Sequence, residues 1–166
     1  MRRPVILLAG VLGTLSAMFV LAPFMAPYGA YLGLDGDPCF VDHPWRLSEA
    51  PYLLGDVLCH QEQGRSFVLN GSQMPVCARD IGIWPGLAVG LLAYIPLERR
   101  FGWRMAAASV LMMCVTVAEW ALEPRIGNVM WVRFASGIVA GIGAGMLAGW
   151  LLGRLALGGE EWNEQA

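Results

Sequence analysis

The residues best suited to chemistry gather between two apolar segments of the chain. Cys59 and His60 are adjacent, Cys77 follows, and Asp80 comes three positions after Cys77. Thiolate, imidazole and carboxylate groups are ligands that zinc and other borderline transition ions accept. Although the spacing is not a standard zinc signature, we predict a metal site made by Cys59, His60, Cys77 and Asp80, with zinc as the first ion to consider.

The same side chains allow other interpretations. A disulfide between Cys59 and Cys77 would close a loop of about 19 residues. By restricting the unfolded chain, it would stabilise the folded protein by about 3 kcal/mol. Cys39 lies in the same region, so three cysteines leave the pairing open. A reactive thiol is a third alternative. Asp80 also suits the N-terminus of a helix, and His60 suits an interfacial hydrogen bond to a carbonyl.

The elements that must position these residues are membrane helices. Of the 166 residues, 57% are hydrophobic and 14% are charged, whereas soluble domains are about 45–50% apolar and about 25% charged. Four segments approach the length of about 20 apolar residues that a spanning helix needs. They are residues 4–28, 81–97, 105–122 and 134–157. We predict an all-α integral membrane protein, a four-helix transmembrane bundle forming one domain over residues 1–166.

The loop of residues 29–80 is too long for a plain connection, so we expect an ordered cap. Ser48 is suited to cap a short helix with Pro51 in its first turn, and Leu54 and Leu58 would share a face on the membrane surface. Asn70-Gly71 is the favoured two-residue turn of a β-hairpin.

Arginines near the ends of the spans predict the orientation. One side of the membrane would carry Arg2, Arg3, Arg99, Arg100, Arg104 and Arg154. Because basic residues favour the cytoplasmic side, both termini should be cytoplasmic and the loop of residues 29–80 extracytoplasmic. Arg125 and Arg133 are exceptions, because this orientation places them on the outer side. The first apolar run resembles a signal peptide, but it is long and lacks a clear cleavage site, so we expect it to be retained.

Small residues recur every fourth position in two of the spans. The fourth span has Gly137, Gly141, Gly145, Gly149 and Gly153, and the second has Gly82, Gly86 and Gly90. The first span offers a shorter stripe of Ala9, Gly13 and Ala17. Such stripes let helix backbones approach closely in lipid. We expect tight packing within the bundle, and a second small-residue face on the fourth span also allows a homo-oligomer or other membrane subunits as partners.

Few ionisable residues lie inside the spans, and Glu119 in the third span therefore needs a partner. We predict an ion pair of Glu119 with Arg133 or Arg79, which would pin the outer ends of the helices together. The alternative role is to orient His60 or a bound anion. Glu123, before Pro124, is interpreted as a helix end, and Cys114 as a packing residue.

Several function classes find no support in the sequence. All 11 basic residues are arginine and the net charge is −2, without a basic face or tail, so nucleic acid is not an expected partner. No Ser-His-Asp order, phosphate loop or two-histidine helix motif is present, and we assign no catalytic residue.

Several spaced motifs resemble an uncharacterised prokaryotic membrane family known as domain of unknown function 2085. They are Cys59-His60-Gln61, Arg65-Ser66-Phe67, Pro75-Val76-Cys77-Ala78-Arg79, Gly82-Ile83 and Gly86, followed by Glu119, Asn128, Arg133, Ser136 and Gly137. The resemblance covers roughly residues 58–141. It implies a prokaryotic inner membrane location, and it implies a metal or redox centre made by Cys59, His60, Cys77 and a further cysteine.

The chain departs from this family pattern at two positions. Asp80 stands where the family usually has the second cysteine of Cys-x-x-Cys, and Trp84 stands in place of a tyrosine. An aspartate keeps a ligand oxygen for a metal, but it removes the vicinal dithiol of a redox site unless Cys39 substitutes. We therefore favour a non-enzymatic accessory or structural subunit of a larger membrane complex. The alternative is a metal-dependent or thiol/quinone membrane oxidoreductase.

Overall fold

The computed structural model describes residues 2–34 and 49–164, and it describes side chains over residues 3–34 and 49–155. Cys39, His43 and Ser48 lie outside the described residues. The elements, in chain order, are α1 (Arg2–Met25), α2 (Ala50–Leu58), a 3-10 helix η1 (Gln63–Arg65), β1 (Val68–Leu69), β2 (Ser72–Gln73), α3 (Ala78–Leu97), α4 (Trp103–Ile126) and α5 (Met130–Glu164).

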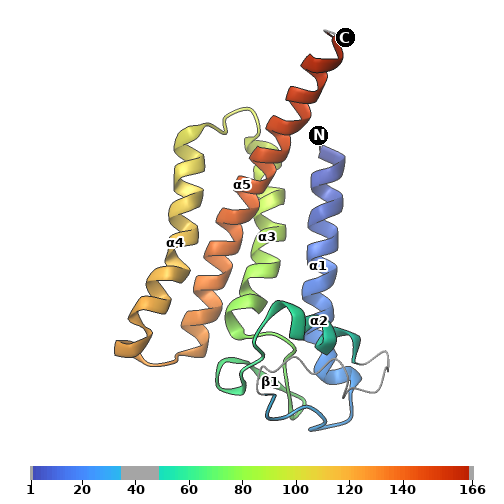
Figure 1. The fold of residues 1–166 in the computed structure, drawn as a ribbon, viewed down its shortest axis with the longest axis vertical. Helices are drawn as coiled ribbons and strands as arrows, with labels where there is room; N and C mark the ends of the chain where they lie inside the picture. The colour runs from blue at the N-terminus through green and yellow to red at the C-terminus, as the bar shows by residue number, and fades with distance from the viewer. Residues whose placement is uncertain (1, 35–48, 165–166) are drawn as a thin grey trace.

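Four of these helices are long and apolar enough to cross a membrane, namely α1, α3, α4 and α5. This confirms the predicted class, an all-α protein built on four transmembrane helices. The short elements between α1 and α3 lie together at one end of the helices, and the two chain termini lie at the opposite end (Figure 1). We call residues 26–34 and 49–77 the cap.

The four long helices lie side by side in the order α4, α5, α3, α1 (Figure 1). The most extensive contact joins α3 to α5, followed by α4 with α5 and α1 with α3. The last helix of the chain therefore occupies the middle of the row. Its neighbours α3 and α4, which are joined by a tight turn, each pack mainly against α5.

Glycines line the seam between α3 and α5. A methyl group on Gly82, Gly86 or Gly90 would overlap carbonyl oxygens of α5. The seam is reciprocal, because a methyl group on Gly137, Gly141 or Gly145 would overlap carbonyl oxygens of α3. Gly149 faces the ring of Tyr94, and Gly153 is buried. The two backbones therefore touch directly, which side chains at these positions would prevent.

The stripe expected in α1 does not form such a seam, so that prediction is wrong. A methyl group on Gly13 would meet no atom within 4 Å, and Ala17 is exposed. Instead, α1 packs through Val5 and Ala9 against Ala88 and Leu91 of α3. Leu12 and Ile95 also pack here, so this contact combines branched side chains with alanines rather than a stripe of glycines.

The cap contains the predicted hairpin. β1 and β2 are antiparallel, with Leu69 opposite Ser72, and the turn residues Asn70 and Gly71 have positive φ angles of 49° and 69°. Two successive positive φ angles are what a tight hairpin turn requires, and asparagine and glycine tolerate them. The amide of Gln73 also donates to the carbonyl of Tyr31 at 2.6 Å, which ties the hairpin to the chain that leaves α1.

The short helix α2 differs from its prediction at its N-cap. Glu49 rather than Ser48 occupies the N-cap position, although proline does stand in the first turn as expected. Leu54 packs against the buried cluster that contains Phe19 of α1, whereas Leu58 is exposed. The two leucines are four residues apart in this α-helix and so share a face, whereas their place on the membrane surface stays a prediction.

Candidate metal centre

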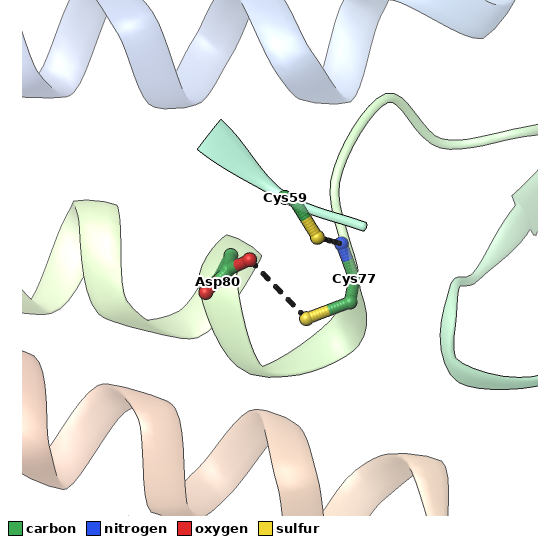
Figure 2. Close-up of side chains that lie close together, drawn as sticks. All are labelled: Cys59, Cys77 and Asp80. Atoms are coloured by element: carbon green, nitrogen blue, oxygen red, sulfur yellow. Dashed lines mark hydrogen bonds between the residues drawn. The ribbon is translucent and has the colours of Figure 1, made fainter. Parts of the chain in front are cut away.

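Cys59, Cys77 and Asp80 lie close together where the cap meets α3 (Figure 2). Cys59 directly follows α2, Cys77 is the N-cap residue of α3, and Asp80 lies in the first turn of α3. The Cys77 amide donates to the Cys59 sulfur at 3.2 Å, and the Cys77 thiol donates to Asp80 Oδ2 at 3.3 Å. One ligand atom from each residue lies within 4.8 Å of the other two, and all three residues are half-buried.

Gln61 holds the two cysteine-bearing segments together. Its side chain is buried, and its Nε2 donates to the carbonyl oxygens of Tyr52 and Pro75, each at 2.9 Å. One bond therefore reaches α2, and the other reaches the segment just before Cys77. Gln61 adopts a positive φ of 44°, a conformation with a steric cost that this pair of hydrogen bonds offsets.

A second glutamine extends the same connection. Gln73 Nε2 donates to the Gln61 carbonyl, and the Tyr52 hydroxyl donates to the Gln73 carbonyl at 2.9 Å. Burial raises the pKa of Tyr52 above its usual range, so this hydroxyl stays protonated and remains a donor. Gly55 lies against the Pro75 carbonyl with no room for a side chain. These contacts explain why residues distant in sequence meet at the site.

The two thiols differ in their electrostatics. A hydrogen bond to Cys77 is the largest influence that raises the pKa of Cys59, and burial adds to it. The same hydrogen bond lowers the pKa of Cys77, because it stabilises that thiolate. Deprotonation of the pair would therefore begin at Cys77, whose thiol donates to Asp80, while Cys59 would keep its proton. The described cysteines, including the exposed Cys114 on α4, are free thiols, and the prediction that Cys114 is packed is wrong.

His60 is the one predicted ligand that the structure does not bring into this cluster. It is exposed, and its ring nitrogens lie outside the group formed by Cys59, Cys77 and Asp80. His60 and the three clustered residues all line one cavity, which has a volume of about 370 Å³. This cavity, which we call the thiol cavity, is lined by Leu58, Cys59, His60, Gln61, Glu62, Arg65, Cys77, Arg79, Asp80 and Arg133.

A buried ion-pair network lies behind the thiol cavity. Glu119 of α4 forms ion pairs with both arginines that the sequence suggested as its partners. Arg79 Nε lies 3.0 Å from Glu119 Oε2, and Arg133 Nε lies 3.9 Å from Glu119 Oε1. The Arg133 side chain is only 2% exposed. The network therefore joins the cap ends of α3, α4 and α5.

Sequence reasoning did not place Arg65, Glu123 and Asn128 in this network, although Arg65 and Asn128 belong to the motifs quoted above. Glu123, interpreted as a plain helix end, forms an ion pair with Arg133 and lies 3.5 Å from Nη2 of Arg65. Asn128 accepts from Arg133 Nε at 2.7 Å and donates to the Gly64 carbonyl. These contacts tie η1 to the α4–α5 connection. The available signal was the presence of Arg125 and Arg133 on the side that the orientation rule predicts to be poor in arginine.

Comparison with known proteins gives a family without an assigned activity. A model described as "Predicted membrane protein (DUF2085)" matches residues 59–147. An uncharacterized protein of the archaeon Methanocaldococcus jannaschii is 40% identical over 129 residues, which cover 75% of this chain and 79% of the relative. No solved structure matches the chain. The chain belongs to this family of predicted membrane proteins, which confirms the resemblance drawn from its motifs.

Proposed function

We propose that this membrane protein binds a transition metal ion, with zinc the best fit, through Cys59, Cys77 and Asp80. The observation that carries the proposal is the meeting of two sulfurs and a carboxylate oxygen within 4.8 Å of one another. Ligands around a tetrahedral zinc are separated by roughly 3.3–3.8 Å, given zinc–sulfur distances of about 2.3 Å. Small side-chain rotations therefore suffice to close the set.

We assign His60 as the fourth ligand in this proposal. Its support is its position on the wall of the thiol cavity, next to Cys59 in the chain. Two thiolates with one imidazole and one carboxylate favour zinc over magnesium or calcium, which prefer oxygen ligands. A bound ion would fasten the end of α2 to the start of α3, so its first role would be to stabilise the cap.

The wider role that we propose is an accessory or structural subunit of a prokaryotic inner-membrane complex, with the cap outside and both termini in the cytoplasm. The arginine distribution supports the orientation. The least buried of the four long helices is α4, with 11% of its most apolar window buried, so it is the helix best placed to meet lipid or another subunit. Purification in mild detergent tests this role, because a subunit should bring stoichiometric larger membrane proteins with it.

A dithiol–disulfide couple is the second candidate function. It is favoured by the proximity of Cys59 and Cys77, which provide two neighbouring thiols although the chain lacks the Cys-x-x-Cys pair. Two-electron oxidation of these thiols would form one disulfide, with a quinone or another disulfide as the oxidant. Thiol labelling with and without reductant detects this couple, because a disulfide protects both residues until it is reduced.

The experiment that tests the metal centre is metal content per chain in detergent-purified protein. We expect about one ion per chain in the wild type, loss of that ion in Cys59→Ser and Asp80→Ala, and weaker binding in His60→Ala. Cys114→Ser is the matched control, because Cys114 is a free thiol on α4 far from the cluster in sequence. Absence of metal from both the wild type and Cys114→Ser would overturn the proposal and leave the disulfide as the better account.

A further inference from the structure

A second cavity lies beside the thiol cavity at the cap end of α4. Its volume is about 690 Å³, and it is lined by Arg65, Trp120, Ala121, Glu123, Pro124 and Asn128. Arg65 borders both cavities, so the two share a wall. The other five residues that line this cavity have no role in the proposed metal site. We therefore consider which ligand the cavity could bind.

The position of this cavity along α4 corresponds to the level of lipid headgroups. A helix of 24 residues extends about 36 Å, at about 1.5 Å per residue, whereas the hydrocarbon core of a bilayer is about 30 Å thick. The last turn of α4, which carries Glu123 and Pro124, therefore emerges at the interface. Trp120 is 63% exposed there, as is common for tryptophans at membrane interfaces.

The charges that line the cavity are balanced. It has one cation, Arg65, and one anion, Glu123, whose Nη2 and Oε1 atoms are 3.5 Å apart. Glu123 also pairs with Arg133, and Arg65 also pairs with Glu62. A purely anionic ligand would meet carboxylates as well as guanidinium groups, and would gain little. A ligand with one charge of each sign matches both sides.

We propose that this cavity binds the headgroup of a zwitterionic phospholipid. The phosphate lies against the Arg65 guanidinium and the Asn128 amide, because a guanidinium offers paired donors to phosphate oxygens. The ammonium group lies against the Glu123 carboxylate and the face of Trp120, where a cation–π contact adds to the ion pair.

The occupant is a membrane lipid rather than a soluble headgroup because of the surroundings of the cavity. Val117 lies one helical turn before Trp120 and Ala121 on the same face of α4, and it is 62% exposed. An acyl chain would cover this apolar side chain while the headgroup fills the cavity. The site needs no metal ion, so it stands independently of the proposed function.

Native mass spectrometry of the full chain, delipidated and then exposed to equal amounts of phosphatidylethanolamine and phosphatidylglycerol, tests this proposal. We expect a preference of about fivefold or more for the zwitterionic lipid, since only this lipid satisfies both charges. Arg65→Gln should reduce that binding about tenfold, and Trp120→Leu should reduce it less. Arg125→Gln is the matched control, because Arg125 is exposed on the same helix end and lines neither cavity.

Three results would overturn the proposal. The first is equal or tighter binding of phosphatidylglycerol. The second is equal loss of binding in Arg65→Gln and Arg125→Gln when the melting temperatures of both variants match the wild type. The third is full displacement of the lipid by soluble phosphoethanolamine at similar concentration, which would assign the cavity to a free headgroup. If Arg65→Gln fails to fold, Trp120→Leu compared with Arg125→Gln decides the same question.

Discussion

The seam between α3 and α5 and the cap end of the bundle hold the molecule together by opposite means. At the seam, glycines remove side chains, and backbone meets backbone at Gly82, Gly86 and Gly90. At the cap end, long polar side chains such as Gln61 and Arg133 reach across between elements and form directed hydrogen bonds and ion pairs. The seam depends on the absence of side chains at its glycines, whereas the cap end depends on hydrogen-bond donors and acceptors at set positions.

The difference follows from the surroundings of each region. Lipid tails are as apolar as leucine, so helices in the hydrocarbon gain from close packing rather than from burying apolar area. Near the interface, polar groups are costly only when they lack partners. Glu119 with its two arginines, and Gln61 with its two carbonyls, have partners. We expect substitutions to act through steric overlap at the seam and through lost partners at the cap end.

The largest effect should come from Arg133. Arg133→Met removes a buried cation and leaves Glu119 and Glu123 without one of their partners. Breaking a buried ion pair on one side costs about 3–5 kcal/mol, and denaturant unfolding in detergent should show a loss of that size. Arg125→Gln, on the exposed end of α4, should change stability by less than about 0.5 kcal/mol. Equal effects would show that the buried network does not hold the cap end together.

The next largest effect should come from Gly90. In Gly90→Ala the new methyl group meets the Ile142 carbonyl of α5, and such overpacking costs about 1–3 kcal/mol. Gly13→Ala in α1 is the matched control. It has open space around the new methyl group, and alanine favours a helix over glycine by up to about 1 kcal/mol. Melting temperatures that fall for Gly90→Ala but hold for Gly13→Ala would support the seam, whereas equal shifts would contradict it.

The smallest effect on stability should come from Asp80→Cys, which exchanges one ligand type for another. We expect the folded protein to remain within about 1 kcal/mol of the wild type, because the cluster is half-buried. Metal should be retained, with the preference moved toward softer ions such as cadmium, because thiolates favour them. Competition between zinc and cadmium, read by metal analysis, measures the change. A variant that folds but binds neither ion would remove Asp80 from the proposed ligand set.

The helices and the hairpin could be predicted because their signals are local. Apolar runs identified the four spanning helices, and Asn70-Gly71 identified the turn. The order α4, α5, α3, α1 could not be predicted, because a stripe of small residues does not indicate which helix packs against it. The stripe in α1 illustrates this limit, since Gly13 has the same spacing signal as Gly90 but touches nothing.

The candidate site was predictable in its residue types and less so in its geometry. Cys59, Cys77 and Asp80 meet, but the ring nitrogens of His60 lie outside their group although His60 adjoins Cys59 in the chain. Gln61 was noted only as part of the Cys59-His60-Gln61 motif, and its structural role was missed because a buried glutamine at positive φ has no periodic pattern. Glu123 was missed because its partners, Arg65 and Arg133, lie far from it or on another helix.

The central place of α5 has a consequence for how the protein is made. The ribosome synthesises α5 after α1, α3 and α4, yet α3 and α4 both pack mainly against it. Until α5 enters the membrane, α3 lacks the partner of its glycine face and α4 lacks its most extensive contact. Glu119 also waits for Arg133, which arrives with the first turn of α5. Insertion of α5 is therefore the step that brings α3 and α4 together in the bundle.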